Sequence, residues 1–143
     1  LIDEVKGLFE YYEALAEEKS IVLTCSGSGF VSGDRLMLRR AISNLLSNAL
    51  RHTPAGGRIV VRVDDTGDSV VKLSVENAGE TIPLEHLPRL FDRFYRVDSS
   101  RQRLSEGSGL GLSITRSILR AHGGDAFIRS EGGMTVFELK IPV

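Results

Sequence analysis

The sequence has little of several residue types, and each scarcity excludes a class of protein. Its one cysteine, Cys25, cannot form an internal disulfide, so a disulfide-stapled scaffold is excluded and a reducing compartment is expected. No apolar run approaches the ~20 residues of a membrane-spanning helix, and no stretch resembles a signal peptide. Neither sign of charge dominates, since 18 basic side chains stand against 19 acidic ones. A polyanion must therefore be held locally, because no global field attracts nucleic acid or an anionic membrane.

What is present is typical of a globular protein. The 143 residues fit one ordinary domain with a sizeable core. Hydrophobic residues make up 41% and charged residues 26%, and neither a repeat nor a long linker divides the chain. We therefore predict a single domain over residues 1–143. The sequence begins with Leu1 rather than methionine, so we expect a fragment of a longer protein.

Periodicity and turn signals predict alternating helices and strands. Apolar residues three and four apart predict helices over residues 2–18, 33–52, 84–90 and 110–122. β-branched runs predict strands over residues 21–24 and 30–31, and two hairpins formed by 58–65 with 69–76 and by 126–130 with 135–141. Residues 26–29 are predicted to turn, and residues 93–108 form a long polar loop of the kind that is either functional or disordered.

The helix predicted over residues 33–52 has two kinds of face. At 100° per residue, its core-facing stripe consists of Leu38, Ile42, Leu45, Leu46 and Ala49. Asn44, Asn48 and Arg51 project from an adjoining strip, with His52 beside them. Asparagines lower helix propensity, whereas an amide oxygen suits Mg²⁺ and an arginine suits phosphate. The strip is therefore a candidate magnesium and phosphate site; the alternative is that both asparagines only bond neighbouring backbone.

A glycine cluster precedes the last predicted helix, in the run Gly107-Ser108-Gly109-Leu110-Gly111-Leu112. Glycines let the backbone approach a ligand closely, and the first amides of a helix favour phosphate. The run is not a Rossmann turn, because Leu112 occupies the third-glycine position and no strand precedes it. It is not a P-loop either, because the lysine-containing ending is absent. We predict a phosphate-binding turn, with a merely flexible turn as the alternative.

A third candidate follows a predicted strand, in the run Glu76-Asn77-Ala78-Gly79-Glu80-Thr81-Ile82-Pro83. The Asn77 amide can accept from one atom of an adenine edge while donating to the next. Gly79 would let the base lie against the backbone. An ordinary turn is the alternative for this run alone. The three features in this order are much less easily explained by chance.

These runs resemble the sequence boxes of sensor histidine kinases, and the likeness covers essentially the whole chain. Residues 43–52 resemble the asparagine box, 77–83 and 107–112 the two glycine boxes, and 91–95 the phenylalanine box. The resemblance implies the catalytic, ATP-binding domain of a two-component sensor kinase. Its fold would be an α/β (α+β) two-layer sandwich of the Bergerat type, with a mixed, mainly antiparallel sheet packed on one face by about three helices. Residues 91–103 and 106–114 are most similar to heavy-metal-sensing kinases.

The resemblance also implies roles for individual residues. Asn48 would coordinate Mg²⁺, and Asn44 and Arg51 would line the phosphate side and act with it in catalysis. His52 would take a place usually held by tyrosine, and Asn77 would meet adenine. The other residues that the resemblance places around the nucleotide are Gly79, Thr81, Ile82, Phe94, Arg96, Gly107, Ser108, Gly109, Leu110, Gly111, Leu112 and Thr135.

The chain departs from the family pattern at three positions. The family usually has aspartate where this chain has Asn77, glycine where it has Thr81, and a second glycine where it has Met134. An amide accepts a weaker hydrogen bond than a carboxylate, by on the order of 1 kcal/mol, so adenine affinity is expected to be modest rather than lost. Residues 97–106 would form a mobile lid over the phosphates.

One further residue bears on the reaction. Related ATPases of the chaperone and mismatch-repair kind carry a water-activating glutamate where this chain has Asn44. Without a base aimed at water, transfer to an external nucleophile is favoured over hydrolysis. None of His52, His86 and His122 lies in the sequence context of a phosphoacceptor, so we predict that this chain alone does not autophosphorylate. The two alternatives are an ATP hydrolase and a nucleotide-binding or docking module without catalysis.

The resemblance implies partners and a location as well. The cofactors would be ATP and Mg²⁺, and the γ-phosphate acceptor would be a histidine on the parent protein's own dimerisation helices. A response regulator would act downstream, with no nucleic acid and no direct membrane contact. The fragment itself would be soluble and would lie on the cytoplasmic side of a bacterial inner-membrane protein.

Overall fold

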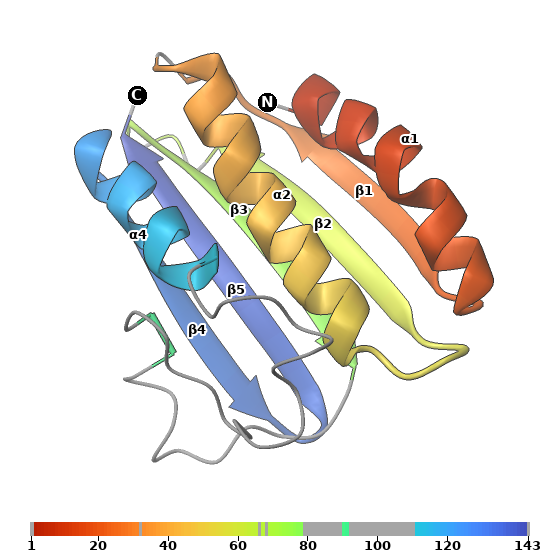
Figure 1. The fold of residues 1–143 in the computed structure, drawn as a ribbon. Helices are drawn as coiled ribbons and strands as arrows, with labels where there is room; N and C mark the ends of the chain where they lie inside the picture. The colour runs from red at the N-terminus through yellow and green to blue at the C-terminus, as the bar shows by residue number, and fades with distance from the viewer. Residues whose placement is uncertain are drawn as a thin grey trace.

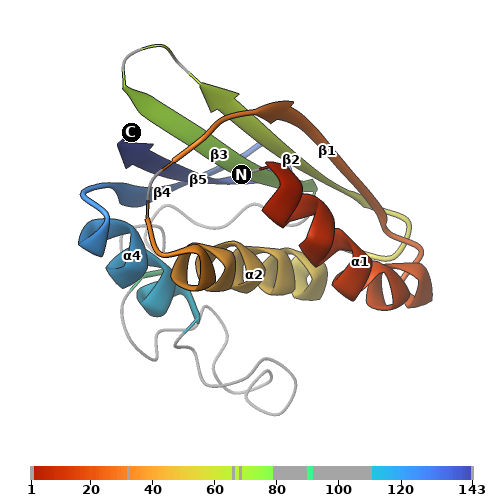
Figure 2. The same cartoon turned by 90° about the horizontal axis from the view of Figure 1, so that it is seen from above.

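The computed structural model describes residues 2–31, 33–65, 67, 69–78, 90–91 and 111–142. These residues form two layers, with helices on one face of a five-stranded sheet (Figures 1 and 2). In chain order the elements are α1 (Ile2–Glu18), β1 (Val22–Ser28), α2 (Arg35–His52), β2 (Arg58–Asp65), β3 (Val70–Ala78), α4 (Gly111–Ala121), β4 (Asp125–Glu131) and β5 (Met134–Pro142). No described helix is long and apolar enough to cross a membrane.

The sheet is mixed and mainly antiparallel. Its strand order is β1-β2-β3-β5-β4, in which β1 pairs with β2 in parallel and every other neighbouring pair is antiparallel. Figure 2 shows α1, α2 and α4 side by side on the same face of this sheet. The predicted two-layer α/β (α+β) sandwich is therefore confirmed.

Helix α2 begins and ends where local chemistry requires. The Asp34 side chain accepts a hydrogen bond from the Met37 backbone N–H at 3.1 Å, which caps the first turn. At the other end, the Thr53 hydroxyl donates to the Ala49 carbonyl at 2.6 Å, and Pro54 then breaks the helix. The five residues of the predicted apolar stripe are all buried. The stripe therefore faces the core, as its spacing predicts.

Strand β1 differs from its prediction. It continues through residues 26–28, where a turn was expected, while Phe30 and Val31 belong to no strand. Gly27 is the reason, because its φ of +97° suits glycine and a Cβ there would lie 1.8 Å from the Val63 carbonyl oxygen. The glycine lets the strand pair closely instead of turning. The predicted helix over 84–90 and loop over 93–108 lie outside the described residues, apart from Leu90, which is in a turn.

The covered face of the sheet consists of rows of side chains that run across the strands. Most rows are apolar and join the helices in the core, with Val75, Phe137, Leu73 and Leu139 among their members. The row at the end of β3 is different. There Asn77 pairs with Thr135, and Thr135 pairs with Ser130 on the edge strand β4. We call Asn77, Thr135 and Ser130 the polar row.

Candidate functional site

Two of the predicted features meet where α2 passes the start of α4. The Asn44 Nδ2 donates to the Gly111 carbonyl oxygen at 3.2 Å, although 67 residues separate the two. Asn48 lies one turn further along the same flank of α2, and both asparagines are half-buried. The structure thus places the asparagine strip beside the last glycine of the glycine cluster.

The first turn of α4 is held against α2 by a residue that sequence reasoning missed. Thr115 is fully buried, and its hydroxyl lies 3.0 Å from the Gly111 carbonyl oxygen and 3.4 Å from the Ala41 carbonyl oxygen. A polar residue four positions after Gly111, in an otherwise apolar helical stripe, is the signal that indicates it. The positive end of the α4 dipole is therefore fixed next to Asn44, where phosphate is the favoured guest.

The structure also describes the other predicted site residues of these two helices. Arg51 is exposed in the last turn of α2, and its Nη1 lies 3.5 Å from the Ser47 Oγ, one turn back. His52 is exposed beside it. Leu112 packs against the core with its half-buried side chain. Arg51 therefore supplies positive charge at the exposed end of the strip, while Leu112 contributes packing.

The polar row is buried at one end of the covered face of the sheet. Figure 1 shows the C-terminal end of α2 over the end of β3, which is where Asn77 lies in the sequence of that strand. Asn77 is 4% exposed, Thr135 5% and Ser130 7%. The Ser130 and Thr135 hydroxyl oxygens are 2.9 Å apart and bond to each other. Ser130 was not predicted, and its signal is a hydroxyl at an inward-facing position of a strand.

The Asn77 side chain is the most informative member of this row. Among the described residues, no hydrogen bond is formed with its amide, although it is as buried as the core. An unsatisfied buried polar group costs about 1–3 kcal/mol, and native proteins rarely tolerate one without a reason. An amide with a donor and an acceptor available in a buried row is suited to a polar ligand that presents both.

A magnesium ion fits the donor set at this place. Within the described ranges, no cluster of three or more histidine, cysteine, aspartate or glutamate side chains could hold a metal. Mg²⁺ needs no such cluster, because it keeps several waters and is bound by one or two protein oxygens together with substrate phosphates. The amide oxygen of Asn48, half-buried on the flank near the α4 N-terminus, is an oxygen donor of this kind.

Phe91 is the described member of the predicted phenylalanine box. It is buried and packs edge-on against Phe137 of β5, with ring centroids 6.5 Å apart. The Arg116 guanidinium of α4 lies over its ring, 5.5 Å from the centroid. The predicted site residues outside the described ranges are Gly79, Thr81, Ile82, Phe94, Arg96, Gly107, Ser108, Gly109 and Leu110.

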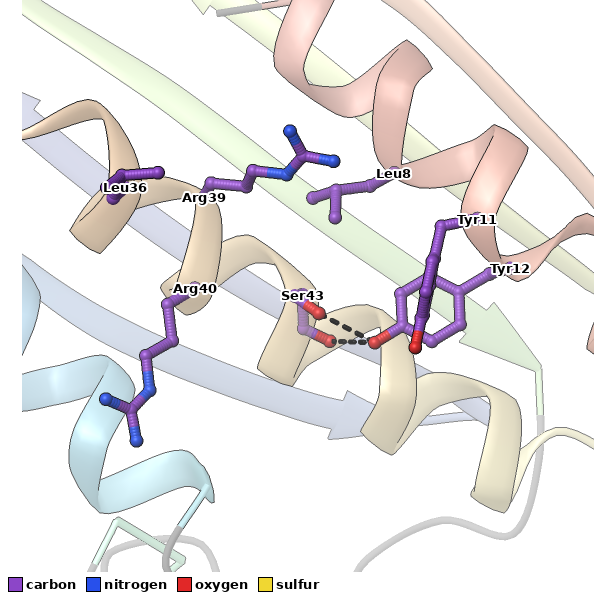
Figure 3. A pocket seen from close by; sticks show the side chains of 7 residues that line it. All are labelled: Leu8, Tyr11, Tyr12, Leu36, Arg39, Arg40 and Ser43. Atoms are coloured by element: carbon purple, nitrogen blue, oxygen red, sulfur yellow. Dashed lines mark hydrogen bonds between the residues drawn. The ribbon is translucent and has the colours of Figure 1, made fainter.

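A groove of about 350 Å³ lies on the opposite flank of α2, between α1 and α2 (Figure 3). Its lining residues are Leu8, Tyr11, Tyr12, Leu36, Arg39, Arg40 and Ser43. The Tyr12 hydroxyl and the Ser43 Oγ are hydrogen-bonded at 2.6 Å across it. We call it the α1–α2 groove. It contains none of the predicted site residues and is separate from the place where Asn44 meets Gly111.

Comparison with known proteins gives one family. The family model described as histidine kinase-, DNA gyrase B-, and HSP90-like ATPase matches residues 33–143. The sensor histidine kinase CusS of Escherichia coli K12 is 55% identical over 143 residues, which are 99% of this chain and 30% of CusS. The sensor protein CzcS of Cupriavidus metallidurans is 39% identical over 98% of this chain and 29% of its own length. The chain thus spans about 30% of the length of such relatives.

Solved structures agree in fold. The nucleotide-free catalytic domain of histidine kinase ThkA superposes with a TM-score of 0.87 at 27% identity, covering 99% of this chain and 91% of that one. The mycobacterial sensor histidine kinase MprB gives a TM-score of 0.82 at 28% identity, with 96% and 94% covered.

Proposed function

The chain belongs to the histidine kinase-, DNA gyrase B- and HSP90-like ATPase family, and from this premise we propose that it is the catalytic domain of a two-component sensor kinase. In this proposal it binds Mg-ATP between α2, the start of α4 and the polar row. It then passes the γ-phosphate to a histidine on a separate helical domain of the parent protein. The observation that carries the proposal is the hydrogen bond from Asn44 to Gly111, which fixes the asparagine strip beside a phosphate-favouring helix terminus.

The main described site residues have the following roles in this proposal. The N-terminal amides of α4 orient the phosphates, and the Asn48 amide oxygen is a ligand for Mg²⁺. The ion, when bound, would neutralise charge that develops on the transferred phosphoryl group. Arg51 adds a cation at the open end of the strip. Asn77 and Thr135 meet the base from the floor of the sheet.

Transfer is proposed over hydrolysis because Asn44 cannot act as a base. An amide does not take up a proton at neutral pH, and the Asn44 Nδ2 is already engaged by the Gly111 carbonyl. No side chain of the asparagine strip thus activates water. We therefore propose that the γ-phosphate passes to a nucleophile outside this chain.

The described histidine at the end of α4 does not provide that nucleophile. His122 Nε2 accepts a hydrogen bond from the Asp34 backbone N–H at 3.0 Å, and its Nδ1 lies 2.8 Å from the Ile118 carbonyl oxygen. The Nε2 bond joins the end of α4 to the residue before α2, and the Nδ1 contact is made to α4 itself, so both ring nitrogens are engaged. Nucleophilic attack needs one free nitrogen, so we propose a structural role for His122.

The wider setting is proposed by likeness. Relatives such as CusS and CzcS are sensor proteins, and ThkA, 26% identical to this chain, has been solved in complex with a response regulator. We propose that residues 1–143 form one domain on the cytoplasmic side of a heavy-metal-sensing kinase, that its substrate domain is the phosphoacceptor helices, and that a response regulator acts downstream.

The test is incubation with γ-labelled ATP and Mg²⁺, first of this chain alone and then with the phosphoacceptor helices of its parent kinase. Label on the helices only is the expected result, and Asn48→Ala should remove it. Label on this chain alone would contradict the proposal. Steady phosphate release without label transfer would favour the hydrolase, and no heat on titration with millimolar Mg-ATP would favour a docking module.

A further inference from the structure

The polar row contains only groups that can either donate or accept a hydrogen bond. Asn77 carries an amide, and Thr135 and Ser130 carry hydroxyls. Their neighbour in the row on β2 is the apolar Ile59. The adjacent carboxylate in the sequence, that of Glu76, lies on the other face of β3 in an ion pair with Arg62. Among the described residues, the row therefore has no group of fixed polarity.

The Asn77 amide is not held in one orientation by the described residues. The terminal torsion of asparagine is broad and roughly two-fold, so turning the amide by about 180° exchanges its donor with its acceptor. Its partner across the strand pair is Thr135, whose hydroxyl is bonded to Ser130 rather than to the amide. No described hydrogen bond thus opposes this exchange.

The exchange of donor and acceptor is what distinguishes two classes of purine. At positions 6 and 1, adenine presents an amino donor and a nitrogen acceptor. Hypoxanthine and guanine present a carbonyl acceptor and an N–H donor at the same two positions. An amide in one orientation satisfies the first pair, and the same amide turned over satisfies the second. A carboxylate would instead repel the carbonyl oxygen, and selectivity between similar ligands usually depends on such a repulsive element.

We propose that the Asn77 row makes this nucleotide site tolerant of the group at position 6, so that it binds 6-oxo-purine triphosphates with an affinity close to that for ATP. The inference rests on the proposed function, because it assumes that the base meets Asn77. Asn77 is thereby a specificity-determining residue. ITP is the sharpest probe, because relative to ATP it differs only at positions 6 and 1 of the base.

The experiment is calorimetric titration of the chain with ATP, ITP and GTP in the presence of Mg²⁺. We expect the ITP dissociation constant to lie within about tenfold of that for ATP, since one net hydrogen bond corresponds to about tenfold or less. Asn77→Asp is expected to lower the affinity for ITP, relative to that for ATP, by a further factor of about ten or more. Asn77→Ser, which is uncharged and smaller, is expected to weaken ATP and ITP by similar factors.

The outcomes separate this inference from the proposed function. If the unaltered chain binds ATP but has a dissociation constant for ITP that is much more than tenfold higher, the inference is overturned and the proposed function is unaffected. The inference would also be overturned if folded Asn77→Asp had the same ratio of ITP to ATP dissociation constants as the unaltered chain. It would likewise be overturned if Asn77→Ser lost affinity for only one of the two nucleotides. Failure of all three nucleotides to bind would overturn the proposed function itself. If Asn77→Asp does not fold, as judged by circular dichroism, the unaltered chain and Asn77→Ser still decide.

Discussion

The two ends of the covered sheet face are equally buried and chemically opposite. Toward one end, β3 and β5 contribute Leu73 and Leu139, and beyond them Val71 and Ile141, which pack under the helices as an ordinary core. At the other end, the same two strands contribute Asn77 and Thr135 at almost the same exposure. Burial of polar groups is unfavourable unless they are satisfied, so stability alone does not explain the second end. The difference is what we expect if the polar end serves the proposed nucleotide and the apolar end serves the fold.

The largest effect is expected at the apolar end. Leu73→Ala should lower the free energy of unfolding by about 2–5 kcal/mol, because it leaves a cavity in a fully buried position. Urea denaturation measures this change. A loss below about 1 kcal/mol would mean that the apolar end is not the structural part of the comparison.

The next largest effect is expected on α2, the helix that carries Asn48. Asn48→Ala should weaken ATP binding by about tenfold or more in the presence of Mg²⁺ and change it little in the absence of Mg²⁺, because the substitution removes the proposed oxygen ligand of the ion. Calorimetry with and without Mg²⁺ measures the difference. The matched control is Ser43→Ala on the opposite flank of the same helix, which should leave nucleotide affinity unchanged. Equal magnesium dependence in Asn48→Ala and the unaltered chain would contradict the assignment of α2.

The sharpest contrast with Leu73→Ala is Asn77→Leu. Replacing a buried amide that has no hydrogen bond among the described residues by an apolar side chain of similar size should leave the free energy of unfolding unchanged or raise it by up to about 1 kcal/mol, while nucleotide affinity falls. Denaturation and nucleotide titration of the same variant test both halves. A destabilisation comparable with that of Leu73→Ala would show that the amide serves the fold after all.

The smallest effect is expected at Asp125, at the start of the edge strand β4. Burial by itself raises the pKa of Asp125, but a hydrogen bond from the Ala126 backbone N–H and the guanidinium groups of Arg116 and Arg120 lower it below its usual value overall. A carboxyl with a depressed folded-state pKa stabilises the fold above its unfolded-state pKa of about 4, and this contribution is lost as the pH falls through the folded value.

The corresponding measurement compares the unaltered chain with Asp125→Asn. The stability difference between them should be constant near neutral pH and should shrink as the pH falls below about 4. A difference that grows on acidification would reverse the sign and contradict the ion pairing with α4.

Local signals were enough to predict much of this architecture. Helix α2 was placed correctly because Asp34 caps it, Pro54 breaks it, and its apolar stripe has helical spacing. The prediction for strand β1 was wrong because glycine is typical of turns. In the structure Gly27 instead allows the backbone to approach Val63 closely, and this contact is visible only once the two strands are paired.

Prediction of the candidate site from the sequence has the same limit. The asparagine strip follows from helical spacing, so its members could be named from the sequence. The contacts of Thr115 with Ala41 and of Asn44 with Gly111 depend on the docking of two helices distant in sequence, which no local pattern encodes. Ser130 joins the polar row only through the register of β4 with β5.

The central claim is that Asn48, the start of α4 and the polar row surround one nucleotide. The most direct test is an NMR titration of the ¹⁵N-labelled chain with Mg-ATP, following the side-chain amides of Asn48 and Asn77 and the backbone amide of Gly111. We expect all three signals to shift with one shared dissociation constant, while Tyr11 in the α1–α2 groove does not respond. Shifts confined to that groove, or different dissociation constants for Asn48 and Asn77, would contradict it.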